Sequence, residues 1–286
     1  MITAPTADVR RRRITDRVMT YLCLGALLVA IAPLASVIGY VTLQGASSVN
    51  WAFFTHLPAP VGELGGGMAN ALGGTLVLVA LASCVGIPIG ILGGLFLSEV
   101  GGGQVGWWVR FTADVLNGVP SIVVGVFIYA LVVVPAKHFS ALAGGLALGV
   151  MMIPLVMRTT EEMVKLVPSS LREASFALGI PWWVTTLRVT LRTATAGVLT
   201  GVTLAIARVL GETAPLLFTA FNNPAWSVRL DQPISSLTVQ LYNYAIAPYD
   251  DWHRQAWAAA LVLMTLTLVL NVAARTAGRR RYAKGR

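Results

Sequence analysis

The sequence predicts an all-α polytopic membrane protein with six transmembrane helices. Of its 286 residues, 56% are hydrophobic and only 12% are charged, whereas charged residues make up about a quarter of a typical soluble domain. No Asp, Glu, Lys or Arg occurs in the stretches 18–62, 64–98, 115–136 and 255–274. Because about 20 apolar residues of helix cross a hydrocarbon core roughly 30 Å thick, these stretches hold several spans.

Six apolar segments are predicted as spans. In chain order they cover residues 18–43, 70–97, 112–134, 140–158, 194–221 and 256–276. The chain then divides into a basic arm (1–17), a first helix with an outer loop (18–69), a main domain (70–277) and a basic tail (278–286).

Positive charges gather in three places and predict how the chain is oriented. The arm holds Arg10 to Arg13 and Arg17, the tail holds Arg279 to Arg281, and the connection 159–193 holds Lys165, Arg172, Arg188 and Arg192. Cytoplasmic segments of membrane proteins carry the excess of Lys and Arg, so both termini and 159–193 are expected in the cytoplasm. Such clusters meet anionic lipid headgroups, which explains the net charge of +9 without nucleic-acid binding.

The first two spans differ in composition. The apolar run of the first span continues far beyond that of a signal peptide, so an uncleaved helix is predicted. The second span is rich in small residues, which let helix backbones approach closely. These residues are Gly73, Gly74, Gly86, Gly90, Gly93 and Gly94. We expect them to serve packing rather than chemistry.

The third span contains a predicted break at Asn117-Gly118-Val119-Pro120-Ser121. Proline removes a backbone donor and glycine loosens the turn, so the helix should be interrupted there. Backbone N–H groups at a new helix start can bind an anion, and Ser121 would add a hydroxyl. The alternative is a plain proline kink that only shapes the packing.

The fourth span ends at Arg158, near the predicted cytoplasmic side. A guanidinium at this position can be a station from which an anion leaves a pore. An ordinary positive anchor at the membrane surface explains the residue equally well.

The connection 159–193 is the one long cytoplasmic segment, and its sequence predicts a helix, a sharp break and a second helix. Residues 171–178 favour a helix, Gly179 suits a left-handed helix end, and Pro181 suits the first turn of the next helix. Apolar and aromatic residues on an exposed turn usually meet a partner, so an interaction element is favoured over a solvated linker. The apolar residues at this break are Phe176, Leu178, Ile180, Trp182 and Trp183. The stretch before it is expected to have a polar side made of Glu161, Glu162 and Lys165.

The fifth span carries two charges, Arg208 and Glu212. Counting about 1.5 Å per residue from Ala194 places Arg208 roughly 20 Å into the helix, past the membrane midplane. Charge inside a membrane is unfavourable and normally faces a water-filled path or a partner. At a spacing of four residues the two side chains would share a helix face and neutralise each other. A guanidinium matches an oxyanion, so a substrate pathway is predicted; the alternative is a structural pair that only holds the bundle together.

The sixth span leads into the basic tail, and the rest of the chain offers little further chemistry. His56, His138, His253, Cys23 and Cys84 lack metal-ligand spacing, so no metal site is predicted. The sequence contains no G-x-x-x-x-G-K-[ST] loop. We therefore expect a chain that is not an enzyme and binds no cofactor, with any ATP hydrolysed by another chain.

Four short motifs carry a resemblance to a known family. Glu173-Ala174-Ser175 followed by Gly179 resembles the EAA motif of ABC importer permeases, with Ser175 in place of the second Ala and Arg192 where Pro is usual. The remaining three motifs resemble phosphate permeases of the PstA type. They are Gly65 to Ala71 (GGGMANA), Gly118 to Gly125 (GVPSIVVG) and Ala207 to Leu217 (ARVLGETAPLL).

The resemblance implies a fold, an activity and partners. The fold would be a MetI-like permease core of five helices with one additional N-terminal helix. The activity would be import of inorganic phosphate by alternating access through a bacterial cytoplasmic membrane. The partners would be a second phosphate permease subunit, two cytoplasmic ATPase subunits and an extracytoplasmic phosphate-binding protein. By the same resemblance, Glu173, Ala174 and Gly179 would dock the ATPase.

Three other readings remain open at this stage. A permease for sulfate, molybdate or phosphonate is the nearest, because a single arginine does not separate tetrahedral oxyanions. A membrane enzyme acting on lipid-linked phosphates would need acids, His or metal ligands gathered at one membrane face, and here they are scattered. A secondary transporter should carry more intramembrane carboxylates than Glu212.

Overall fold

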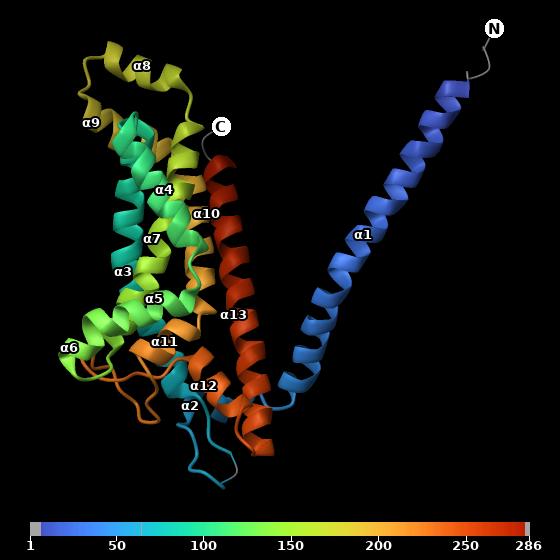
Figure 1. Ribbon diagram of the computed structural model, residues 1–286, viewed down its shortest axis with the longest axis vertical. Coiled ribbons are helices and arrows are strands. Elements are labelled where there is room, and N and C mark those ends of the chain that lie inside the picture. The colour runs from blue at the N-terminus through green and yellow to red at the C-terminus, as the bar shows by residue number, and fades with distance from the viewer. Residues whose placement is uncertain (1–6, 64, 284–286) are drawn as a thin grey trace.

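The computed structural model describes residues 7–63 and 65–283, and within them the chain is a bundle of helices (Figure 1). The described residues form no strand, only an isolated bridge between Pro58 and Gly66. Residues 1–6 of the predicted arm and 284–286 of the predicted tail lie outside the described part of the chain.

The helices have the following bounds. In chain order they are α1 (Ala7–Ala46), α2 (Trp51–Thr55), α3 (Ala69–Glu99), α4 (Gln104–Gly118), α5 (Ser121–Ile128), α6 (Val134–Ala136), α7 (Ala141–Lys165), α8 (Ser169–Ala177), α9 (Trp182–Val184), α10 (Leu191–Leu210), α11 (Ala214–Thr219), α12 (Leu237–Ala245) and α13 (Asp250–Ala283). Wider π-helical turns, Tyr129–Val133 and Thr185–Thr190, join α5 to α6 and α9 to α10.

Five of the six predicted spans correspond to continuous helices that are long and apolar enough to cross a membrane: α1, α3, α7, the stretch Trp182–Leu210, and α13. The third predicted span, 112–134, is instead a pair of helices, α4 and α5, that meet at 103°. The break was predicted, and the sharp turn of the chain at Pro120 makes the third predicted span a broken one. Counted as one broken span, this pair brings the total to six.

The predicted ends of two other spans were wrong. The fourth span continues to Lys165 rather than ending at Arg158, so part of the predicted connection 159–193 belongs to α7. The fifth span ends at Leu210 rather than at residue 221, and the short helix α11 follows it. Pro215 accounts for this second break, because its ring would clash with the carbonyl four residues earlier in a continuous helix.

The core lies between α3 and α7, which pack closely through glycines one turn apart. A Cβ added at Gly86, Gly90 or Gly94 would lie 2.6 Å from an atom of α7. These contacts confirm the packing role predicted for the small residues of the second span. On the other side of α7, Gly197 and Gly201 of α10 approach it equally closely.

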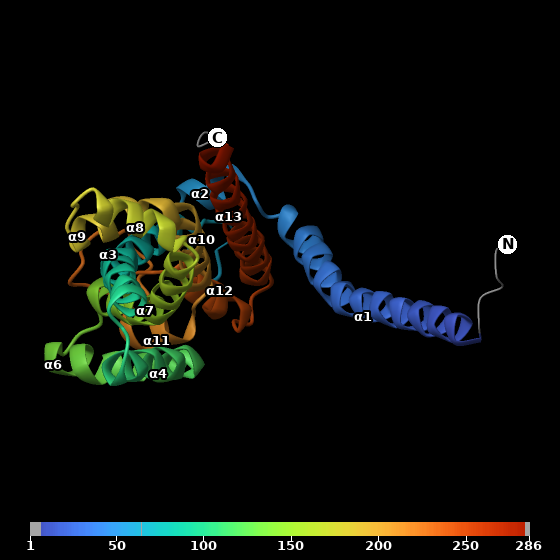
Figure 2. The ribbon, with the colours of Figure 1, turned by 90° about the horizontal axis from the view of Figure 1, so that it is seen from above.

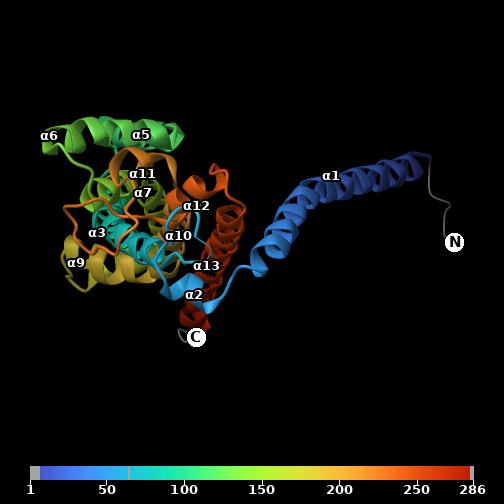
Figure 3. The ribbon, with the colours of Figure 1, turned by 90° about the horizontal axis from the view of Figure 1, so that it is seen from below.

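Helix α1 leaves the bundle at its C-terminal end and extends away from it (Figures 1, 2 and 3). It meets α13 where Gly45 faces Trp257 and Leu261, and the ring of Tyr40 lies 5.2 Å from that of Trp257. Most of its other described side chains are exposed. The helix also includes Arg10 to Arg13, so the described part of the basic arm continues the first span as helix.

The two ends of the bundle differ in what they carry (Figure 1). One end, here called the hairpin end, holds α8 and α9 together with the start of α1 and the last turns of α13. The opposite end, here called the loop end, holds α2, α12 and the segment 222–236. The start of α1 and the last turns of α13 therefore lie on the same side as the predicted cytoplasmic connection (Figure 1).

Candidate functional site

Arg208 and Glu212 lie where α10 ends. Arg208 belongs to the last turn of the helix, Gly211 is its C-cap, and Glu212 follows outside it. The two side chains therefore do not share one helix face as predicted. Arg208 Nε lies 4.0 Å from Glu212 Oε1, and the side chains are 41% and 17% exposed. This separation is at the upper distance limit of an ion pair. The Arg208 guanidinium is therefore largely free to contact a molecule at the surface of the chain.

The chain after Glu212 is fixed by contacts that leave its carboxylate free to move. Thr238 Oγ1 of α12 donates a hydrogen bond to the Glu212 carbonyl at 2.8 Å. Pro215 lies in the first turn of α11, where its missing N–H is no loss because the first turn of a helix has no partner for it. The backbone of Glu212 is held, while its side chain has only the distant Arg208 Nε as a cationic neighbour among the described ion pairs.

Ser121 lies near the same region through helix packing. It is the first residue of α5, as the sequence predicted, and α5 packs against α11. A Cβ added at Gly125 would lie 2.5 Å from the Cα of Pro215. Gly125 is one turn after Ser121, and Pro215 is three residues after Glu212. Two of the three motifs that resemble phosphate permeases, Gly118 to Gly125 and Ala207 to Leu217, thus meet in space.

Arg158 lies elsewhere, nearer the hairpin end. Gly201 of α10 packs on Thr159, the neighbour of Arg158, so these residues lie at the same level. Arg208 is seven residues further along α10, about 10 Å along the helix axis. The structure therefore does not bring the two predicted arginines of the pathway together.

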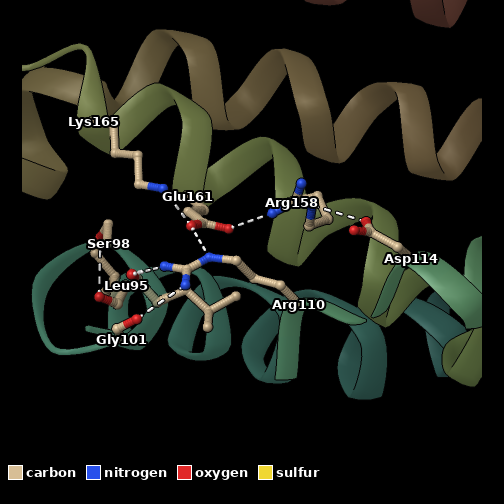
Figure 4. Close-up of polar contacts among 9 residues, drawn as sticks. Leu95, Ser98, Gly101, Arg110, Asp114, Arg158, Glu161 and Lys165 are labelled. Carbon is tan, nitrogen blue, oxygen red and sulfur yellow. Dashed lines mark hydrogen bonds and ion pairs between the residues drawn. The ribbon is translucent and has the colours of Figure 1, made fainter. Parts of the chain in front are cut away.

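Arg158 instead belongs to a group of five charges, here called the Glu161 cluster (Figure 4). The Glu161 side chain is 1% exposed, and its oxygens contact Arg110 Nε at 2.6 Å, Arg158 NH1 at 2.8 Å and Lys165 Nζ at 2.5 Å. Arg158 Nε also contacts Asp114 Oδ1 at 3.1 Å. Of the predicted polar side, Glu162 and Lys165 are exposed, whereas Glu161 is buried, because α7 continues past Arg158 and this carboxylate faces α4.

The sequence reasoning missed the Glu161 cluster because its members are far apart in the chain. Arg110 and Glu161 are separated by 51 residues. Arg110 also lay outside the predicted third span, 112–134. A usable signal was present, since Arg110 and Asp114 are four residues apart and must share one face of α4.

The predicted hairpin is present at one end of the molecule, formed by α8, a tight turn and α9 (Figure 1). Gly179 has a φ of +73°, the left-handed conformation predicted for it. The turn is closed by Gly179 N–H donating to the Phe176 carbonyl and Ile180 N–H donating to the Ser175 carbonyl. Glu173 and Ala174 are exposed on α8. These residues are available to a partner.

A buried contact braces this hairpin. Ser175 Oγ and Thr185 Oγ1 lie 2.7 Å apart, and both residues are buried. Ser175 is the position at which the sequence departs from the EAA pattern. The apolar residues at the turn are exposed, as the sequence predicted: Phe176, Leu178, Trp182 and Trp183. The hairpin thus combines a fixed backbone with an open apolar surface.

The remaining charges of the loop end lie on the surface. In the segment 222–236, Arg229 and Asp231 are exposed, and NH2 of Arg229 lies 2.9 Å from Oδ2 of Asp231. The hydrogen bond from Arg229 holds the pKa of the Asp231 carboxyl below its ordinary value. Within the described residues, no group of three or more His, Cys, Asp or Glu side chains could hold a metal ion.

Comparisons with known proteins agree with this architecture. Residues 86–281 match the family described as binding-protein-dependent transport system inner membrane component. The chain is 42% identical over 267 residues to the phosphate transport system permease protein PstA of Yersinia pestis, covering 92% of this chain and 90% of that protein. It is 45% identical over 224 residues to the PstA protein of Pasteurella multocida, covering 78% and 79%.

A solved structure supports the fold. A chain of the MetNI methionine ABC transporter, in an inward-facing conformation, superimposes with a TM-score of 0.56 and 20% sequence identity. The match covers 74% of this chain and 93% of that one.

Proposed function

The chain belongs to the PstA-type branch of the binding-protein-dependent transport system inner membrane components, and on that basis we propose that it is the pore-forming permease subunit of an ATP-driven importer of inorganic phosphate. The sequence holds no loop of the kind that cradles ATP phosphates. In this proposal two cytoplasmic ATPase subunits hydrolyse the nucleotide, and this chain moves in response.

The observation that carries the proposal is the loose Arg208–Glu212 pair inside a membrane protein. A guanidinium that is 41% exposed at the end of a span cannot rest against lipid tails. The surface around it therefore faces a watery path or a second permease subunit. Phosphate is an oxyanion, and the planar fork of Arg208 offers several donors to it. At 4.0 Å, Glu212 competes only weakly with such an anion.

Glu212 has a second part in this mechanism. When phosphate is absent, its carboxylate partly neutralises Arg208, and when phosphate is bound, it repels the anion. This repulsion limits how tightly phosphate is held, which a transporter needs in order to release its cargo. The break between α10 and α11 contains Glu212, and α11 packs against α5, so movement of this break changes access to the pair.

Ser121 and Arg158 extend the proposed path on either side. Ser121, at the start of α5, would offer its hydroxyl to phosphate near Arg208. Arg158 would be the exit station, about 10 Å nearer the hairpin end. Its partner Asp114 is 57% exposed, so an anion can replace Asp114 while Arg158 keeps its contact with Glu161.

The proposed partners follow from the two ends of the bundle. The exposed hairpin residues Glu173, Ala174 and Gly179 would dock an ATPase subunit, and the hairpin end would then face the cytoplasm. A phosphate-binding protein would meet the loop end outside a bacterial cytoplasmic membrane. A second permease subunit would complete the pore beside Arg208.

The test is uptake of radiolabelled phosphate by vesicles that contain the complete complex. We expect ATP-dependent uptake that excess unlabelled phosphate abolishes and equal concentrations of sulfate, molybdate or phosphonate leave intact. Uptake of sulfate or molybdate in place of phosphate would assign the chain to another oxyanion. The absence of ATP-dependent uptake of any of them would refute the importer.

A further inference from the structure

Arg110 of α4 joins three helices through one side chain (Figure 4). Its Nε contacts the buried Glu161 of α7 at 2.6 Å. Its NH1 donates to the Gly101 carbonyl at 3.0 Å, and its NH2 donates to the Leu97 carbonyl at 2.7 Å. These carbonyls belong to the last turn of α3 and to the residues just after it, where a helix leaves its carbonyls without partners. A cation is also favourable at this end of a helix dipole.

The same turn of α3 is connected to the hairpin. Glu99 lies between Leu97 and Gly101, and its Oε1 contacts Arg172 NH2 of α8 at 2.9 Å. Arg172 NH2 also donates to the Val164 carbonyl of α7 at 3.2 Å. The last turn of α3 is therefore bound to the hairpin on one side and to α4 on the other.

Helix α4 is held loosely apart from these charges. Its only buried residues are Gly106 and Ala113. Between α4 and α7 there is an apolar cleft of ≈ 250 Å³, lined in part by Trp108, Leu116 and Met157. Because few side chains of α4 interlock with the bundle, its position depends on Arg110 and on the contact between Asp114 and Arg158.

If Arg110 is replaced by a neutral residue, the buried Glu161 carboxylate still has cationic partners. Glu161 would keep Arg158 and Lys165, both on its own helix. No isolated buried charge is created, so the bundle should still fold. What disappears is the link from α4 to the last turn of α3 and to Glu161, while the contact of Asp114 with Arg158 still joins α4 to α7.

We propose that Arg110 is a positioning residue that makes α4 follow the α8–α9 hairpin through the last turn of α3. Movement imposed on the hairpin passes from Arg172 to Glu99, then through the α3 backbone to Arg110. It moves α4 and so changes the break at Val119 and Pro120, next to the packing of α5 on α11. The inference rests on the proposed function, since it concerns how ATPase movement reaches the substrate path.

The first test compares transport with ATP hydrolysis in the reconstituted complex. For Arg110→Gln we expect uptake per ATP hydrolysed to fall at least about fivefold, while the hydrolysis rate itself stays within about twofold of the original. Arg17→Gln, which removes an exposed arginine from α1, is the matched control and should change neither. An unchanged uptake per ATP, or a parallel loss of both rates, would overturn the proposal. If the complex with Arg110→Gln does not assemble, Arg110→Lys takes its place in this test. Lysine can keep the contact with Glu161 but cannot donate to both carbonyls, so uptake per ATP should again fall.

The second test measures distances and needs no substrate. Spin labels at Ser170 of α8 and Val105 of α4, both exposed, are placed in a chain whose Cys23 and Cys84 are replaced by Ser. With Arg110 present, the label distance should be narrow and equal with and without ATP, because the two helices move together. With Arg110→Gln it should broaden or shift when ATP is added. A distance that changes with ATP even when Arg110 is present, or one that Arg110→Gln leaves unaltered, contradicts the proposal.

A third set of variants tests whether the contacts act in series. Glu99→Gln should reproduce the loss seen with Arg110→Gln, and the double variant should be no worse than either alone. The charge exchange Glu99→Arg with Arg172→Glu should restore coupling. Multiplied losses in the double variant would mean that the two contacts act independently, against the proposal. Should phosphate prove the wrong cargo, the distance measurement still judges Arg110, so the two proposals fail separately.

Discussion

Glu161 and Glu212 are both carboxylates near the ends of predicted spans, Glu161 inside α7 and Glu212 just past α10, yet their surroundings are opposite. Glu161 has three cationic nitrogens at 2.5–2.8 Å and is 1% exposed. Glu212 has one at 4.0 Å and is 17% exposed. In the first case the carboxylate is saturated by fixed partners on two helices, and in the second it is nearly free. Our proposal assigns these two kinds of charge different purposes.

The difference follows from where each carboxylate sits in its helix. Glu161 lies inside α7, facing α4, so helix packing brings Arg110 to it. Glu212 lies just past the end of α10, where the chain turns towards Pro215, so no helix geometry holds it against Arg208. A tight cluster fixes the helices, whereas a loose pair leaves an arginine available to a passing anion.

The largest expected effect comes from breaking the tight cluster. Glu161→Gln removes the charge shared by three cations and should lower the free energy of unfolding by about 2 kcal/mol, less than for a fully buried pair because Arg158 and Lys165 are partly exposed. Denaturation of the purified chain in mild detergent would measure it. Equal stability of the variant and the original would mean that the cluster does not fix the helices.

The next largest effect comes from the loose pair, in transport rather than stability. Arg208→Gln removes the charge-assisted donors and should reduce phosphate uptake about tenfold, while Arg208→Lys should lose less because it keeps the charge. The unfolding free energy should change by less than about 0.5 kcal/mol, since the pair is long and exposed. If Arg208→Gln lowered the free energy of unfolding as much as Glu161→Gln does, the Arg208–Glu212 pair would also be a structural contact, against this account.

A smaller effect is expected at the other member of the loose pair. Glu212→Gln removes the weak competitor of phosphate, so the half-saturating phosphate concentration should fall about threefold. Release should slow in the same variant, and single-turnover uptake would show this. Weaker phosphate binding in Glu212→Gln would contradict the role given to Glu212.

The smallest effect concerns an exposed pair that belongs to neither group. Arg229 keeps the pKa of Asp231 below its ordinary value, so the pair contributes fully at neutral pH. Its contribution is lost only as the pH falls through the lowered pKa. Asp231→Asn should therefore leave uptake at neutral pH unchanged and lower the melting temperature only slightly there, and in acid this small difference between the two proteins should vanish. A clear loss at pH 7 would show that exposed pairs matter more than assumed.

The sequence was a good guide wherever one local signal decides the structure. Charge-free stretches located the spans, Gly179 predicted the left-handed turn, and Gly118 with Pro120 predicted the first break. Proline alone is not decisive, because Pro33, Pro88 and Pro154 lie inside continuous helices. The break before Pro215 was missed for that reason, since the apolar run continues across it.

The candidate site was less predictable, because it depends on contacts between distant segments. Arg208 and Glu212 could be singled out as charges in an apolar run, but their 4.0 Å separation depends on where α10 ends. The Glu161 cluster forms only because α4 lies beside the last turns of α3 and α7, and no local sequence pattern predicts that arrangement. Only the spacing of Arg110 and Asp114 hinted at a partner.

Chemical access to position 208 tests most directly whether the loose arginine lines the phosphate path. In a chain with Cys23 and Cys84 replaced by Ser, Arg208→Cys in the assembled complex is treated with a small, charged, water-soluble thiol reagent. We expect labelling that depends on the ATP state and that an oxyanion substrate slows in a complex whose partner subunits remain intact. If position 208 stays unlabelled in every nucleotide state, it never meets water, and the proposed pathway is wrong.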